Sequence, residues 1–160
     1  MAYRPRHPSA VSRNMAAIRG RDTACEIALR RALHRLGIRY RLHHPGVPGK
    51  PDLVFPVVKV AVFVDGDFWH GRMLRQLSPS ALRRRLRARG AFWLAKLRRN
   101  QERDRRQSAQ LRRSGWSVLR IWESDIRTRP GFALTKVLRT LAQRGYALPA
   151  ACLFSLKTAG

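Results

Sequence analysis

The chain has 160 residues, enough for one domain with a buried core, and its 34 basic against nine acidic residues give a formal net charge of +25. The electrostatic field of such a positive charge attracts polyanions to the protein surface, so nucleic acid is the expected partner. No apolar run spans a bilayer, no secretion signal opens the chain, and two distant cysteines exclude a disulfide framework, which predicts a cytoplasmic, DNA-facing protein with no membrane partner.

Residues 1–20 are basic and weakly periodic, which predicts a flexible arm with a short helix over 11–18. Such an arm either orders on a polyanion, as minor-groove arms do, or stays a solvated tail. Thr23 and Glu26 then have the spacing of a capping box, and a leucine stripe at Leu29 and Leu33 predicts a helix that ends before Gly37. The cap gives Glu26 a structural role with which any catalytic role competes.

Three strands are predicted next, over residues 38–42, 51–55 and 57–64, with a loop rich in proline and glycine after the first. His43 and His44 are neighbours on an extended chain and point in opposite directions, so one ion does not bind both. A hairpin formed by the second and third strands brings Asp52 beside Asp65. Two carboxylates are therefore expected to converge.

Residues 63–71 combine two carboxylates, an imidazole and two aromatics at the end of an apolar strand that Gly66 breaks. Asp65 and Asp67 are candidate metal ligands, and His70 is a candidate proton acceptor. Phe68 with Trp69 forms a candidate stacking wedge. The alternative is a turn with a packed aromatic pair.

Residues 72–90 are rich in arginine and predict a loop or a solvated helix facing DNA, followed by a long helix over 92–113. On that helix, Trp93, Lys96, Asn100 and Asp104 share one face. A helix face that packs against a core is apolar, so the polar groups on this face favour a functional site. The alternative is a solvent-exposed face with salt bridges. A strand over 116–122 and a helix over 130–144 complete a single domain, 21–145, before a tail, 146–160.

These motifs, in this order, resemble the very-short-patch-repair (Vsr) DNA mismatch endonucleases, a branch of the PD-(D/E)xK restriction-endonuclease-like fold. The resemblance lies in residues 12–18, 21–26, 48–52, 63–71, 92–96, 100–104 and 115–123. It implies an α/β fold with a central mixed β-sheet flanked by α-helices. It also implies a monomeric, nucleoid-associated bacterial enzyme that uses one or two Mg²⁺ ions to nick double-stranded DNA at T:G mismatches and so starts short-patch repair.

The resemblance also implies roles for individual residues. Asp52 and the main-chain carbonyl of Val64 match the metal ligands, and His70 matches the histidine that takes a proton from the attacking water. The other matches are Glu26 and Asp104 as outer acidic residues, Phe68, Trp69 and Trp93 as the aromatic wedge, and Met15, Lys96 and Asn100 as contacts to the mismatched bases, while Arg13 in the arm is a further DNA-binding candidate.

Two departures from the family pattern concern metals. Family members bind a structural zinc beside this motif, but the matching positions here are Asp67, Arg72, Leu74 and Ser124, which do not make a zinc site. No structural zinc is therefore expected, and packing or an ion pair of Asp67 with an arginine should hold the loop. Asp65 stands where the family often has histidine, which makes it a candidate second Mg²⁺ ligand.

Two alternatives to a mismatch endonuclease remain open from the sequence. One is a PD-(D/E)xK nuclease of a restriction or defence system without mismatch specificity. The other is a catalytically dead DNA-binding protein.

Overall fold

The structure is a computed structural model and describes residues 22–42, 44–72, 76, 78, 80–81 and 90–152. The predicted arm with its helix over 11–18, His43, and the arginine run over 83–89 lie outside the described residues. In chain order, the elements are α2 (Ala24–Arg35), β1 (Leu53–Phe55), β2 (Val60–Asp65), α5 (Gly90–Arg113), β3 (Ser117–Trp122), α6 (Glu123–Thr128) and α7 (Pro130–Gln143).

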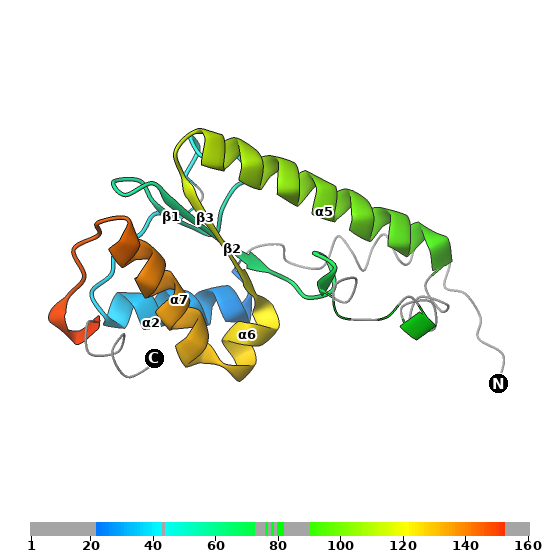
Figure 1. The fold of residues 1–160 in the computed structure, drawn as a ribbon. Coiled ribbons are helices and arrows are strands. Elements are labelled where there is room, and N and C mark those ends of the chain that lie inside the picture. The colour runs from blue at the N-terminus through cyan, green and yellow to red at the C-terminus, as the bar shows by residue number, and fades with distance from the viewer. Residues whose placement is uncertain are drawn as a thin grey trace.

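β2 is the middle strand of a mixed sheet. It pairs antiparallel with β1, where Leu53 lies opposite Val62, and parallel with β3, where Val62 lies opposite Leu119. The parallel pair requires a crossover, which contains α5. Helices cover both faces of the sheet, with α5 on one side and α2, α6 and α7 on the other (Figure 1). This architecture confirms the predicted fold class.

Alternation along β2 divides its side chains between two cores. Val60 and Val62 pack with α2 and α7, whereas Ala61 and Phe63 pack with Leu111 of α5. Because side chains alternate with a period of two, Asp65 continues the α5 side of the strand. The end of β2 thus presents a carboxylate toward the long helix.

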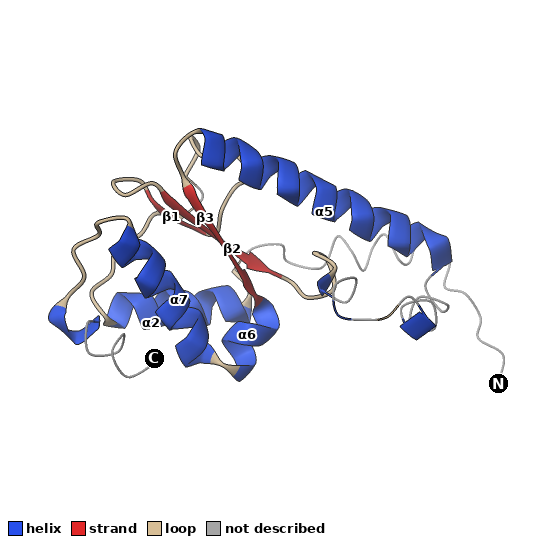
Figure 2. Ribbon diagram, viewed as in Figure 1, coloured by secondary structure: helices blue, strands red, loops and turns tan. Residues whose placement is uncertain are grey.

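α2 is the helix predicted from the capping box. Thr23 is the N-cap, and its hydroxyl accepts a hydrogen bond from the backbone N–H of Glu26. Leu29 and Leu33 are buried on its inner face, where truncation of either to alanine would cost about 2–5 kcal/mol. α5 and α7 also lie where their helical patterns predict them (Figure 2).

Two local predictions need correction, and one short helix was not predicted. Residues 38–42 form no strand, and only Arg41 makes an isolated bridge, to Val54. The reason is that β1 is three residues long and offers little edge for pairing. β2 begins at Val60 and not at residue 57, because residues 56–59 form a turn in which Lys59 has a φ of 51°. The six-residue α6 was not predicted, since its length is below the range in which periodicity is informative.

The predicted tail, 146–160, begins against the core. Tyr146 makes an edge contact with Phe55 at 5.9 Å between ring centroids, and Cys152 is fully buried. Among the described residues, both cysteines are free and buried. No helix in the described ranges has the length and hydrophobicity of a membrane span.

Candidate active site

A cleft of about 750 Å³ lies between the end of β2, the turn after it, α5 and the start of α2. Its lining includes all five residues predicted to be catalytic: Glu26, Asp52, Asp65, His70 and Asp104. Four cationic residues share the wall: Lys50, Lys96, Arg103 and Arg120. A cleft lined by both acidic and cationic side chains suits the approach of a phosphodiester to a bound cation.

Asp52 is placed by the hairpin, as predicted. Its backbone N–H donates to the carbonyl of Val62 at 2.9 Å, and its carboxylate Oδ2 accepts from the N–H of Val64 at 2.7 Å. Burial raises the pKa of Asp52 to about 6; the Val64 hydrogen bond opposes this shift and the charge of Glu26 adds to it. An ionised Asp52 is therefore undercompensated, which is the condition that a bound cation relieves.

Asp65 lies on the same side of the sheet as expected, but both of its carboxylate oxygens accept hydrogen bonds from Arg120. Nε of Arg120 is 2.6 Å from Oδ2, and Nη2 is 2.6 Å from Oδ1. Asp65 is buried, so the pair is a bidentate, largely desolvated contact. The role of Asp65 as a second metal ligand stays a prediction, and it would require one of these oxygens to leave the guanidinium.

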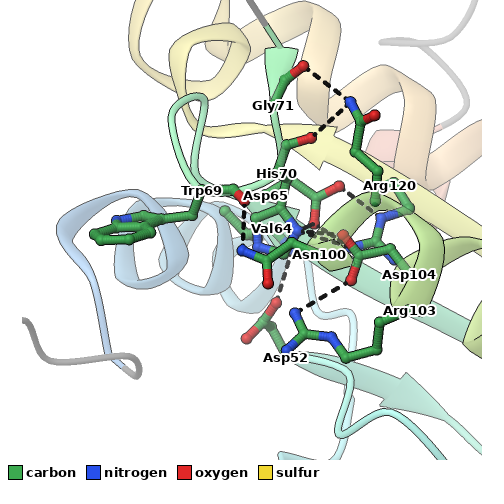
Figure 3. A network of polar contacts seen from close by, with 11 residues as sticks. Asp52, Val64, Asp65, Trp69, His70, Gly71, Asn100, Arg103, Asp104 and Arg120 are labelled. Atoms are coloured by element: carbon green, nitrogen blue, oxygen red, sulfur yellow. Dashed lines mark hydrogen bonds and ion pairs between the residues drawn. The ribbon is translucent and has the colours of Figure 1, made fainter. Parts of the chain in front are cut away.

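His70 and Asp104 form a close pair across the cleft (Figure 3), with Nδ1 2.6 Å from Oδ2. Burial opposes ionisation of Asp104, but the hydrogen bond from His70 and the charge of Arg120 outweigh it and lower the pKa of Asp104. An ionised carboxylate can only accept, so Nδ1 carries the proton. In the neutral ring, Nε2 is then the nitrogen with a free lone pair.

Amide side chains of α5 fix the turn that carries His70. Nδ2 of Asn100 donates to the carbonyl of Trp69 at 2.9 Å, and Nε2 of Gln101 donates to the carbonyl of Gly71 at 3.1 Å. Asn100 therefore has a structural contact at the position predicted to touch a base. The predicted polar face of α5 is confirmed, because Lys96, Asn100 and Asp104 all line the cleft.

The three predicted wedge residues form one aromatic cluster. Ring centroids of Phe68 lie 5.1 Å from Trp69 and 5.4 Å from Trp93, and the two indoles are 5.7 Å apart. Nζ of Lys96 lies 5.6 Å from the Trp69 centroid and 5.4 Å from that of Trp93. The Trp69 ring points away from the polar network (Figure 3). The cluster can therefore meet a ligand beside the acidic site without disturbing it.

Glu26 is a cap partner first. Its carboxylate accepts from the N–H of Asp22 and the hydroxyl of Thr23, each at 3.0 Å, and pairs with Arg30 at 2.8 Å. Glu26 is buried and lines the cleft beside Asp52. Its catalytic role remains a prediction alongside this structural one.

Three of the positions that match zinc ligands in the family, Asp67, Arg72 and Ser124, form a polar cluster with Asp125, and this cluster is here called the clamp. Arg72 donates to Asp67 at 3.3 Å, to the Ser124 hydroxyl at 2.6 Å and to Asp125 at 3.1 Å. The hydroxyl of Ser124 also donates to Asp67 at 2.6 Å. A guanidinium among hard oxygens does not fit zinc. The expected ion pair of Asp67 with an arginine is present. The contacts of Arg72 with Ser124 and Asp125 join the turn to α6.

A divalent cation fits the Asp52 end of the cleft because that carboxylate is partly buried and, when ionised, undercompensated. In the described ranges, no three His, Cys, Asp or Glu side chains are already grouped to hold a metal ion. The candidate ligands at this end of the cleft are the Asp52 carboxylate and the predicted carbonyl of Val64, a residue that also lines the cleft.

Arg120 and Gln101 belong to the site although sequence reasoning did not select them. A charged residue between Leu119 and Ile121 in an apolar strand was the available signal for Arg120. No pattern distinguishes Gln101 from its neighbours on α5. The predicted DNA contacts Arg13 and Met15 lie outside the described residues, as does Leu74, which matches a zinc-ligand position of the family.

The mixed sheet, with Asp52 and His70 in a basic cleft, defines a nuclease of the restriction-endonuclease-like class, whose members generally use a divalent metal ion. The profile of the family described as DNA mismatch endonuclease Vsr matches residues 6–76. The chain is 38% identical to the DNA mismatch endonuclease Vsr of Escherichia coli strain K12, over 74% of this chain and 72% of that protein. The chain belongs to the Vsr family and is a DNA-nicking endonuclease.

Further relatives carry a different description. The chain is 40% identical to the type II nicking enzyme V.NmeDIP of Neisseria meningitidis serogroup C, over 70% of this chain and 72% of that protein. It is 46% identical to the type II nicking enzyme V.NaeI of Lentzea aerocolonigenes, over 71% and 68% respectively. The family is thus established and DNA is the partner, whereas these relatives are described as type II nicking enzymes and not as mismatch endonucleases.

Proposed function

We propose that the protein nicks duplex DNA beside T:G mismatches in a Mg²⁺-dependent reaction and so starts very-short-patch repair. The observation that carries the proposal is the aromatic cluster of Phe68, Trp69 and Trp93 directly beside the cleft that holds Asp52 and His70. Inserting rings between base steps costs a few kcal/mol and costs least at a mispair. A wedge at the cutting site therefore favours mismatched DNA.

In this proposal, Asp52 and the Val64 carbonyl hold Mg²⁺. When bound, Mg²⁺ would coordinate oxygen ligands and stabilise the charge that develops on the phosphate. Nε2 of His70 takes the proton from the attacking water, while Asp104 keeps Nδ1 protonated and the ring oriented. Glu26, as an outer acid, helps to order water at the buried side of the cleft.

The proposed DNA contacts come from the α5 wall of the cleft and from the N-terminal arm. Lys96, held over two indoles, and Asn100 lie on the α5 wall and face the bases that the wedge separates. Met15 and Arg13 are proposed to add contacts from the arm over 1–20. We also propose that a monomer is the active form, with residues 21–145 as the catalytic domain; light scattering after gel filtration showing a dimer would contradict this.

Strand-labelled duplexes that differ only by T:G or T:A at one position test the function. Incubated with Mg²⁺, the enzyme should nick the thymine strand of the T:G duplex and leave the T:A duplex intact. Equal cutting of both duplexes would reject mismatch specificity.

A second candidate is nicking without mismatch preference in a restriction system. It is supported by the similarity to V.NmeDIP and V.NaeI, which are named type II nicking enzymes. Nicking of fully paired duplex at a short recognition sequence would favour this candidate. A catalytically dead DNA-binding protein does not agree with Asp52, His70 and Asp104 sharing one cleft.

A further inference from the structure

We propose that Arg120 is a positioning residue: by occupying Asp65, it leaves Asp104 to hold the imidazole of His70. The inference rests on the proposed role of His70 as proton acceptor. It adds a residue on β3 to a cleft described above by the end of β2, the turn after it, α5 and the start of α2.

The geometry of Arg120 is fixed from two directions. Its backbone lies opposite Phe63 in the parallel register, and its guanidinium carbon sits 4.8 Å from the centroid of the Phe63 ring. The fork faces Asp65, two residues further along the neighbouring strand, with two contacts of 2.6 Å. Stacking and bidentate pairing together leave the guanidinium little rotational freedom.

Nη2 of Arg120 also reaches the histidine pair. It lies 3.4 Å from Oδ2 of Asp104 and 3.3 Å from Nδ1 of His70. Because Nδ1 already donates to the ionised Asp104, the contact between Arg120 and Nδ1 joins two donors and is not a hydrogen bond. The guanidinium therefore acts on the imidazole through its two carboxylate neighbours.

Asp65 would compete with Asp104 for the Nδ1–H of His70 if Arg120 did not pair with it. Its Oδ1 lies 3.6 Å from Nδ1 of His70, only 1.0 Å farther than the Oδ2 of Asp104. Without Arg120, a buried carboxylate would lack its partner and would attract the Nδ1–H. A ring turned toward Asp65 would carry Nε2 away from its present direction, and small misplacements of a reacting group reduce rates strongly.

The first test replaces the guanidinium of Arg120 by an ammonium group and so keeps the positive charge. In the full chain, Arg120→Lys should fold normally and bind T:G duplex with unchanged affinity, yet nick it about tenfold to a hundredfold more slowly in single turnover. Arg129→Lys is the matched control, because Arg129 pairs with Asp125 away from the cleft. A wild-type rate for Arg120→Lys would overturn the proposal, since charge alone would then suffice. Parallel losses of melting temperature, affinity and rate would overturn it as well, since the role would then be structural.

The second test needs no DNA and reads the Nδ1–H proton of His70 by NMR, identified by its absence in His70→Gln. The signal should be lost or shifted in Arg120→Met, where Asp65 is released. It should return in the double variant Arg120→Met with Asp65→Asn, where no competing carboxylate remains. An unchanged signal in Arg120→Met, or an equal loss in the double variant, would overturn the proposal.

If Arg120→Met does not fold, Arg120→Lys provides the same spectral comparison. A wild-type enzyme that fails to nick the T:G duplex would reject the proposed function and leave the NMR result standing. The two failures are therefore distinguishable.

Discussion

Replacing Asp52 by asparagine should stabilise the metal-free protein. The amide can still accept the hydrogen bond from the N–H of Val64, while the partly buried charge is removed. The pKa of Asp52 rises from 3.8 to about 6 on folding. This shift of about two units corresponds to roughly 3 kcal/mol that the ionised carboxylate costs the folded state.

The contribution of Asp52 to the free energy of unfolding depends on pH. A carboxyl whose pKa is raised on folding contributes stability that is complete below pH 3.8 and is lost as the pH rises through about 6. The difference in unfolding free energy between Asp52→Asn and wild type should therefore grow over pH 4 to 7 and reach about 3 kcal/mol. Urea denaturation at several pH values measures it. No growth with pH, or a less stable variant at pH 7, would refute the account of Asp52.

Asp125→Asn is the matched control because it should behave in the opposite way. Burial opposes ionisation of Asp125, but hydrogen bonds from Arg129 and Arg72 outweigh it and lower the pKa of this carboxyl. Its stabilising contribution is present at neutral pH and lost as the pH falls through its folded pKa. Asp125→Asn should therefore destabilise the protein at pH 7 and less so in acid.

Mg²⁺ should raise the unfolding free energy of wild type, by about 2.7 kcal/mol at a hundredfold excess over its dissociation constant, and leave Asp52→Asn unchanged. Trp69→Ala should reduce discrimination between T:G and T:A duplexes more than it reduces binding to matched DNA; equal losses in a binding assay would count against a wedge. His70→Gln should slow single-turnover nicking by about 10²–10⁴-fold at unchanged DNA affinity, and a near-normal rate would remove His70 from the chemistry. Arg72→Met should lower the unfolding free energy by about 3 kcal/mol, measured in urea, whereas a chelator should leave wild type unchanged. A protein that melts earlier with chelator in the absence of Mg²⁺ would instead indicate a structural metal.

The sequence predicted those site residues whose positions follow from the repeat pattern of a single strand or helix. The apolar alternation of β2 ending at Asp65, and the polar face of α5 at Lys96, Asn100 and Asp104, both place side chains through the local geometry of one element. The hairpin placed Asp52 because an antiparallel pair with a short turn fixes its own register. These predictions needed no knowledge of distant neighbours.

Contacts between elements far apart in sequence were not predictable in the same way. Arg120 reaches Asp65 because β3 pairs parallel to β2, and the register of that pair is set only after the chain has crossed over α5. The clamp likewise joins Arg72 to Ser124 and Asp125, more than fifty residues later. Local sequence patterns show a charged residue in an apolar strand, but they do not show its partner.

Asp52→Ala, assayed for nicking and for DNA binding on the same T:G duplex with Mg²⁺, tests the central claim most directly. Cleavage in single turnover should fall by about a thousandfold or more, because the carboxylate proposed to hold the cation is gone. DNA affinity should stay the same or increase, since a negative charge leaves the cleft. A variant that still nicks at a rate near that of wild type would show that the hydrolytic centre does not lie at Asp52.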